Sequence, residues 1–333
     1  RVAFREDALF QGHAIVILGN LGKRGVKVEL ATKFLQSSIS LFKQFENDAA
    51  GVKARSLSLT VCALHGLGNL IKGLHPGSEF ISQMFWFGMT LAYVDNVVFY
   101  HYATAYITTT LNKMIENCEE SDGNLLEYLF EKRKIFGSHI MEFDSFHGFK
   151  LQIESFDIIA LTVCAKGIQV PFTASSSLEC LKILLKARYS YEVRRSKLTG
   201  DAISPSCYSY ISILFMLVSS DEDLQKILED CGFPKKEFVS LSDKVNIPEE
   251  LLIFLATESL EASSTIFLLS TYFSTCKLDE TSILKFMCLF EWLYDNHSRL
   301  AWEAYPQIAD ILRKFTETSA SLTLAQFSMK ILV

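Results

Sequence analysis

Two stretches near the start of the chain carry apolar residues at three- and four-residue spacing, on either side of Gly22-Lys23-Arg24-Gly25. The apolar positions are Leu9, Phe10, Ala14, Ile17, Leu18 and Leu21 before this break and Val28, Leu30, Ala31, Phe34, Leu35, Ile39, Leu41, Phe42 and Phe45 after it. This period predicts two helices joined by a tight turn. One hairpin cannot bury both apolar stripes, so it is stable only when further hairpins stack against it.

The same pattern recurs along the chain and predicts an all-α fold. Further helical pairs are expected at residues 57–92, 97–143, 151–193 and 207–231, followed by helices at 249–276, 280–296, 300–315 and 319–333. Apolar stretches that open the first three pairs begin at Leu9, Leu57 and Val97, with separations of 48 and 40 residues. That period is typical of HEAT and armadillo repeats. We therefore predict a HEAT/armadillo-like α-solenoid of stacked helical pairs, with residues 235–246 irregular and polar.

Length and local composition divide the predicted solenoid into three parts. At 333 residues the chain is longer than one that ordinarily folds around a single hydrophobic core. Residues 1–195 are expected to form α-solenoid repeats, and residues 196–246 a linker-like stretch with a short helical pair. Residues 247–333 are expected to form acidic helical repeats, since the chain from Val245 onward has 11 acidic and 6 basic residues.

Charge and cysteine usage exclude several classes of protein. The net charge of −6 argues against a nucleic-acid binder, which needs a basic face for phosphates. Eight scattered cysteines without paired spacing indicate buried free thiols in a reducing compartment. We expect no transmembrane helix, because each apolar stretch is interrupted or too short. The chain begins at Arg1 with no targeting pattern, so we expect a cytoplasmic piece of a longer protein.

Three short motifs are candidate sites. The string from Gly19 to Arg24 lacks the first glycine and the Ser or Thr of a phosphate loop and is better explained as a helix end. Cys62 and His65 have ligand-like spacing but no second pair for zinc, so a buried thiol is favoured. A third cluster, interpreted as polar groups at a helix end, comprises His139, Asp144 and His147. We expect no catalytic residue, cofactor or metal.

Two surface-related patterns remain. An aromatic cluster is interpreted as packing between repeats rather than a base-stacking platform, because no basic groove accompanies it; it comprises Phe85, Trp86, Phe87, Tyr93, Phe99, Tyr100 and Tyr102. A basic segment is interpreted first as a solvated helix face and second as a binding surface for an acidic protein or an anionic membrane; it comprises Lys182, Lys186, Arg188, Arg194, Arg195 and Lys197.

Five segments, taken in order, resemble the C-terminal helical-repeat region of neurofibromin and of the fungal Ira-type Ras GTPase-activating proteins. They are Ala-Ile-Val-Ile-Leu-Gly-Asn-Leu-Gly-Lys-Arg at 14–24, Phe-Trp-Phe-Gly-Met-Thr-Leu at 85–91, Tyr-Val-Asp-Asn-Val-Val-Phe-Tyr at 93–100, and residues 178–189 and 266–310. The likeness covers packing positions over nearly the whole chain, and its general character favours the fungal branch.

The resemblance implies a large cytosolic negative regulator of Ras signalling, which in fungi is the Ras–cAMP pathway. Such proteins act on Ras through a central GTPase-activating domain that inserts an arginine. They also carry a lipid-binding module, which implies peripheral membrane association through other domains, and their helical arrays form a homodimer. The Phe-Leu-Arg segment of the activating domain is absent from this sequence. The resemblance therefore implies a non-catalytic scaffold segment that binds protein partners, with Ras bound by a domain outside it.

Two alternatives stay open on the sequence alone. One is a helical-repeat adaptor of another class, such as a nuclear-transport receptor or a vesicle-coat subunit. The irregular stretches at 196–206 and 235–246 count mildly against a long regular array of that kind. The other is a helical enzyme whose site is assembled from residues distant in sequence.

Overall fold

The computed structural model describes most of the chain as helices that gather into two compact units. The described residues are 8–25, 27–48, 53–94, 96–119, 125–135, 156–168, 170–199, 206–218, 220–257, 259–275 and 279–296, with 309 and 313. The first unit comprises residues 1–153 and 170–187, and the second comprises 154–169 and 188–333. The predicted division of the chain into three parts was based on its repeats, whereas these two units are defined by compactness. The three-part division therefore stays a prediction.

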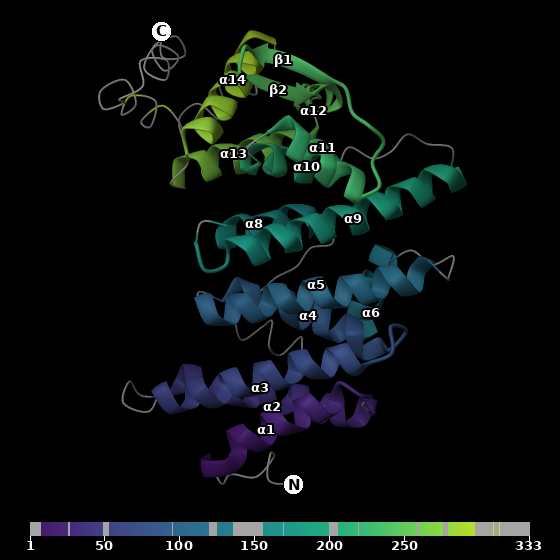
Figure 1. The fold of residues 1–333 in the computed structure, drawn as a ribbon, viewed down its shortest axis with the longest axis vertical. Coiled ribbons are helices and arrows are strands. Elements are labelled where there is room, and N and C mark those ends of the chain that lie inside the picture. The colour runs from purple at the N-terminus through teal and green to yellow at the C-terminus, as the bar shows by residue number, and fades with distance from the viewer. Residues whose placement is uncertain are drawn as a thin grey trace. The chain divides into compact units, whose positions relative to one another are not determined.

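Six helices and the first part of a seventh make up the described first unit (Figure 1). They are α1 (Ala8–Gly22), α2 (Val28–Asn47), α3 (Lys53–Gly73), α4 (Glu79–Tyr93), α5 (Val97–Glu119), α6 (Leu125–Ile135) and α9 (Ala174–Thr199) as far as residue 187. The first residues of α1, α3 and α5 are separated by 45 and 44 residues. These helices confirm the first three predicted pairs, as far as the described residues extend.

Helix α4 forms the core of the first unit because it is apolar on every face. All its residues from 80 to 92 are buried except Gln83. It packs against α5, α6 and α2, and the Trp86 indole N–H donates a hydrogen bond of 3.0 Å to the Leu129 carbonyl of α6. A helix that is apolar all round needs neighbours on all sides. The helices around α4 supply them.

Glycines bring α1 and α3 into backbone contact. A Cβ atom added at Gly19 would lie 2.5 Å from the Gly66 Cα, and one at Gly22 would lie 2.1 Å from a Leu70 methyl carbon. No side chain larger than hydrogen fits at Gly19 without moving a backbone. The Gly19–Arg24 string therefore ends a packed helix, which confirms the structural interpretation of that motif.

The second unit is arranged around α10 (Ser206–Leu217), in which every residue from 209 to 216 is buried. Helix α10 packs against α8, α12, α13 and α14. The elements of this unit are α8 (Phe156–Ile168), α9 from residue 188, α10, α11 (Asp221–Asp230), β1 (Phe238–Ser242), β2 (Val245–Pro248), α12 (Glu249–Leu255), α13 (Leu260–Thr275) and α14 (Glu280–Asn296).

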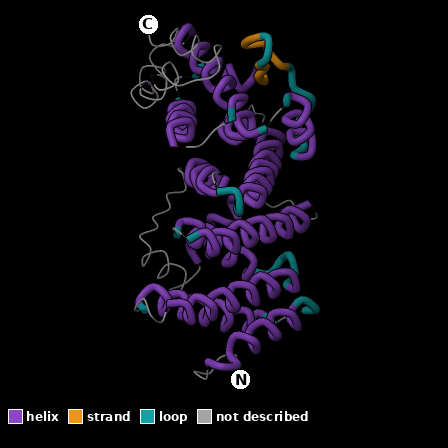
Figure 2. Tube along the Cα trace, turned by 60° about the vertical axis from the view of Figure 1, so that its left-hand side comes forward, coloured by secondary structure: helices purple, strands orange, loops and turns teal. Residues whose placement is uncertain are grey.

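The β-hairpin formed by β1 and β2 contradicts the expectation that residues 235–246 are irregular (Figure 2). The two strands pair antiparallel, with Val239 opposite Ile247 and an irregularity between Ser240 and Ser242. Val245 and Ile247 are buried, whereas Val239 is exposed. The strands contact α12 and α14, so tertiary packing of β2 stabilises a hairpin whose outer strand is too polar to signal one. Elsewhere in the described residues the elements are helices, which confirms the all-α prediction.

Two further helix boundaries differ from prediction. Residues 249–276 form two helices, α12 and α13, bent by 104°, with Ser259 Oγ accepting a hydrogen bond of 3.1 Å from the Ala262 N–H. Helix α9 extends to Thr199, so residues 196–199 are helical rather than linker. The helices predicted at 300–315 and 319–333 lie outside the described residues, apart from Ala309 and Arg313.

Among the described helices, no single one is long and apolar enough to cross a membrane. The bent pair α12–α13 passes the same test only when its two helices are counted together.

The glycine contact predicts a difference between two alanine variants of α1. Gly19→Ala should lower the free energy of unfolding by about 1–3 kcal/mol, because the new methyl group meets the Gly66 backbone. Gly12→Ala is the matched control: its methyl group would lie 3.4 Å from Cys62 Sγ, an ordinary contact. It should gain up to about 1 kcal/mol from helix propensity. Urea unfolding followed by circular dichroism measures both, and equal effects would contradict the close approach.

A buried charge in α4 should unfold the first unit. Phe85 is fully buried, whereas Tyr93 at the end of the same helix is 54% exposed. Phe85→Asp should destabilise the unit by at least about 4 kcal/mol, because it loses a large apolar side chain and buries a carboxylate. Tyr93→Asp should change stability by less than about 1 kcal/mol. Thermal melting of both variants tests the assignment, which fails if the two melt alike.

Candidate functional site

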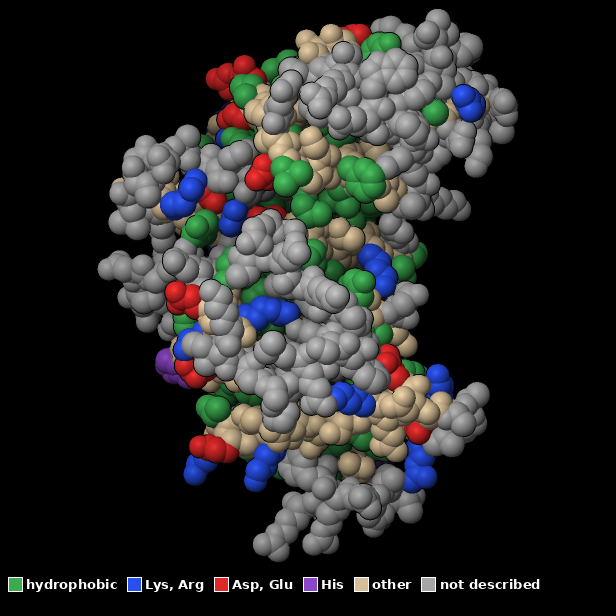
Figure 3. All heavy atoms as spheres, turned by 180° about the vertical axis from the view of Figure 1, so that it is seen from behind, with side chains coloured by type: hydrophobic (Ala, Val, Ile, Leu, Met, Phe, Trp, Pro, Cys, Tyr) green, Lys and Arg blue, Asp and Glu red, His purple; other side chains and the backbone are tan. Residues whose placement is uncertain are grey.

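The predicted basic segment lies along α9, and its residues fall into different surroundings. Lys182 and Lys186 are partly exposed in the first unit. Lys197 is exposed in the second unit, and the side chain of Arg194 lies outside the described part of the chain. On the face shown in Figure 3, the described Lys and Arg side chains are scattered among Asp and Glu rather than gathered in one patch. The role of this segment in binding a partner stays a prediction.

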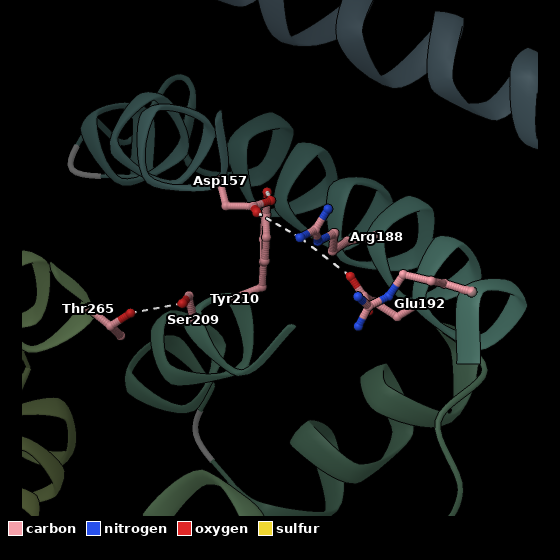
Figure 4. A network of polar contacts seen from close by, with 7 residues as sticks. Asp157, Arg188, Glu192, Ser209, Tyr210 and Thr265 are labelled. Carbon is pink, nitrogen blue, oxygen red and sulfur yellow. Dashed lines mark hydrogen bonds and ion pairs between the residues drawn. The ribbon is translucent and has the colours of Figure 1, made fainter. Parts of the chain in front are cut away.

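Two arginines of the basic segment are instead part of a charged network in the second unit (Figure 4). Arg188 Nη2 lies 3.4 Å from Asp157 Oδ2 of α8 and 3.4 Å from Glu192 Oε1 one turn further along α9. Arg195 Nη2 lies 3.2 Å from the second oxygen of the same glutamate. The side chains of Arg188 and Glu192 are 16% and 1% exposed. Interpreting Arg188 as part of a solvated face was therefore wrong.

Helix α10 completes the network. The Tyr210 hydroxyl donates a hydrogen bond of 2.8 Å to Asp157 Oδ1. One residue earlier, the hydroxyls of Ser209 and Thr265 of α13 lie 2.8 Å apart, as Figure 4 shows. Side chains of α8, α9, α10 and α13 thus supply partners for one another's buried oxygen atoms.

Burial sets the electrostatics of the network. Burial raises the pKa of the Asp157 carboxyl, and the Arg188 charge and the Tyr210 hydrogen bond offset only part of this effect. Burial opposes the charge on Arg188, but the two neighbouring carboxylates still raise its pKa. Burial also raises the pKa of the neighbouring Cys207 thiol strongly. Since the thiolate is the reactive form of cysteine, this thiol is held in its unreactive state.

The arrangement can fix helices but offers no activated nucleophile among these residues. Arg188 is held by two carboxylates, Asp157 accepts bonds from two neighbouring helices, and Cys207 is protonated. Breaking a buried ion pair is costly because it leaves an uncompensated charge. The network therefore acts as an internal electrostatic clamp on α8, α9 and α10.

A second buried cation has the same kind of role. Lys285 of α14 is 3% exposed, and its Nζ donates to the Phe215 and Val218 carbonyls at 2.9 and 2.7 Å. These carbonyls belong to the end of α10, where helix carbonyls lack partners within the helix. In the first unit, Lys113 of α5 donates to the Leu74 carbonyl just after α3 at 2.9 Å. Both lysines cap neighbouring helices.

Cys62 and His65 lie in different surroundings in the structure. Cys62 is half-buried, where a Cβ at Gly12 of α1 would lie 3.4 Å from its sulfur, and burial raises the pKa of its thiol. His65 is exposed, with its ring 6.4 Å from that of Tyr102. No group of His, Cys, Asp and Glu in the described residues could hold a metal ion. His139, Asp144 and His147 lie outside those residues.

The aromatic cluster is packing, as predicted, except at one position. Buried members are Phe85, Trp86, Phe87, Phe99 and Tyr100. The Tyr100 hydroxyl lies 3.0 Å from that of Ser177 on α9, within the first unit. Tyr102 is partly buried, whereas Tyr93 is exposed and is not part of this core.

The sequence analysis did not identify the carboxylates that form ion pairs with these arginines. One signal was available: Glu192 lies four residues after Arg188 and three before Arg195, the spacings at which helical side chains meet. No local pattern marks Asp157 or Tyr210 as partners, because they come from other helices.

Comparison with known proteins identifies two relatives in Saccharomyces cerevisiae. The chain is 23% identical to "Inhibitory regulator protein IRA1" over 293 residues, which cover 87% of this chain and 9% of the relative. It is 21% identical to "Inhibitory regulator protein IRA2" over 335 aligned residues, which cover 99% of this chain and 10% of the relative. The chain is homologous to both over most of its length but spans only about a tenth of theirs. No family model matches it.

The clamp predicts that two basic residues on α9 differ sharply in importance. Arg188→Met should destabilise the second unit by about 3–5 kcal/mol, because Asp157 and Glu192 lose their shared cation while buried. Lys186→Met is the control, since that side chain is partly exposed, and its effect should stay within about 0.5 kcal/mol. Urea unfolding measures both, and a neutral Arg188→Met would show that the clamp does not stabilise the unit.

Proposed function

We propose that this chain is a non-catalytic helical scaffold segment of an Ira-type Ras GTPase-activating protein. In this role it supports a negative regulator of Ras signalling, of the Ras–cAMP kind, and contributes to dimerisation and to the docking of protein partners. The proposal places the chain in the cytoplasm, with any membrane association supplied by other domains. The activating domain itself would lie elsewhere in the protein.

The observation that carries the proposal is the way the chain aligns with its relatives. Homology to two proteins named inhibitory regulators extends over 87% and 99% of the chain, yet covers 9% and 10% of theirs. A match of this kind is expected for one structural segment of a very large protein. The segments that resemble the helical region of neurofibromin and Ira proteins are distributed along the same length.

The internal chemistry of the helices supports a positioning role. Arg188, Lys285 and Lys113 are directed at carboxylates or helix carbonyls within their own units. These bonds hold helices in place, and stacked helices hold whatever is attached to them at fixed separations. The surface lysines Lys182 and Lys186 remain our candidates in the first unit for an acidic partner, through long-range attraction that weakens with salt.

Exchange of this segment into a yeast relative tests the proposal. A strain whose IRA2 lacks the matched tenth of its length should accumulate GTP-bound Ras. Inserting this chain at that place should restore a low level, whereas inserting the chain with Phe85→Asp should not. The isolated chain should give no stimulation of GTP hydrolysis by purified Ras.

Two results would contradict the proposal. Stimulation of GTP hydrolysis by the isolated chain would show a catalytic rather than a scaffolding part. An expressed exchange protein that behaves like the deletion would show that the chain does not supply the scaffold of its relatives.

A further inference from the structure

Helix α13 of the second unit exposes two large apolar side chains on one face. Leu260 is 81% exposed and Phe267 is 57% exposed. The two residues lie seven positions apart, which is close to two helical turns, so they are on the same side of the helix. Ser264 and Thr271 lie on this side as well and are partly buried. We call these four residues the outer face of α13.

The inner face of α13 is buried in the second unit. Helix α13 packs against α8, α10, α12 and α14. Its buried residues include Ala262, Thr265, Ile266, Leu269, Tyr272 and Phe273. Packing of the unit therefore takes up the inner face and leaves Leu260 and Phe267 facing outward, where their apolar area is available to a partner.

The charges on α12 and α13 have one sign. The two helices carry three acidic residues and no basic residue. Glu261 is exposed and directly follows Leu260. The other two, Glu249 and Glu250, lie one turn before Ile253 of α12, an isoleucine that is 61% exposed. Exposed apolar and acidic side chains thus occur together on both helices.

Helix α14, which packs against α13, adds only acidic charge to the surface. Its one basic residue, Lys285, is buried and donates to α10 carbonyls. Glu280 and Asp295 are exposed. Every charged side chain that α12, α13 and α14 expose is therefore acidic, and this surface attracts a positively charged partner.

The combination of apolar area and acidic charge favours one kind of partner. An anionic membrane or a nucleic acid would bring its phosphates against the acidic residues. An amphipathic protein helix with basic residues along its edges would bring opposite charges instead. Apolar positions that recur at three, four and seven residues on such a helix would lie along Leu260 and Phe267.

We propose that the outer face of α13 is a docking site for an amphipathic helix of another protein, with leucine or phenylalanine in its apolar stripe and lysine or arginine along its edges. The inference deepens the docking of protein partners in the proposed function and rests on that function only for its biological setting. A single helix buries less than the ~1,000 Å² that a stable interface needs. The contact is therefore transient, with a dissociation constant on the order of 10 μM or higher.

Binding of a synthetic probe to the full chain tests the inference. The probe is a fluorescent peptide of about 18 residues that forms an amphipathic helix with leucine on one side and lysine on the other. Fluorescence anisotropy should show binding that weakens as salt is raised, because exposed charges are screened. The same peptide with glutamate in place of lysine should bind at least about 10-fold more weakly.

Matched variants test whether the peptide binds at α13. Phe267→Ser should weaken binding of the leucine–lysine peptide at least about 10-fold, because it removes an aromatic anchor. Phe172→Ser is the control: this phenylalanine of the first unit is 67% exposed, and its variant should bind within about 2-fold of the original chain. Circular dichroism checks that both variants are folded.

Charge reversal supplies a second pair of variants. Glu261→Lys should weaken binding by about 3-fold to 10-fold, because it places a like charge beside the peptide. Glu179→Lys reverses an exposed glutamate of α9 in the first unit, and its effect should stay below about 2-fold. Both changes are at exposed positions, so this result does not depend on the folding of the Phe267 variant.

Four outcomes would overturn the inference. They are no binding of the leucine–lysine peptide, equal binding of the leucine–glutamate peptide, equal losses in Phe172→Ser and Phe267→Ser, and binding to phosphatidylserine vesicles that Phe267→Ser abolishes. The last result would make the outer face of α13 a membrane contact. None of these measurements depends on the level of GTP-bound Ras in the yeast exchange, so failure here and failure of the proposed function are distinguishable.

Discussion

Burial of a helix that has no polar face is the constraint on which each unit depends. Helices α4 and α10 carry no charged side chain from residues 80 to 92 and 209 to 216 and are buried almost throughout these ranges, α4 among α2, α5 and α6, and α10 among α8, α12, α13 and α14. Such a helix cannot lie at a surface, so its position fixes those of its neighbours. The outer helices need only one apolar stripe each, which explains why their sequences tolerate so many charges.

The charges that remain inside are used to fasten helix to helix. Arg188 forms ion pairs with carboxylates of α8 and α9. Lys285 and Lys113 cap the C-terminal ends of neighbouring helices by donating hydrogen bonds to their carbonyls. Long basic side chains can bury their stems while their charged ends reach a partner several ångströms away. In a helical array, basic residues along a helix are therefore poor evidence of a binding surface until their carboxylate partners are known.

Much of the secondary structure could be predicted because it follows from local patterns. The turn at Gly22–Gly25 and the span of α14 were both visible as changes in apolar period. The β-hairpin was not, because only β2 is buried and its signal is two apolar residues long. The bend after α12 was missed because the apolar period continues through it. The Asp157 and Tyr210 contacts to the network depend on tertiary placement that no local pattern contains.

The order in which the units take up the chain has a consequence of its own. Residues 154–169 belong to the second unit but precede residues 170–187 of the first, and one unbroken helix, α9, passes from the first unit into the second. No single cut can then separate the two units without leaving one of them incomplete. A chain that ended at residue 187 would keep every residue of the first unit but only residues 154–169 of the second.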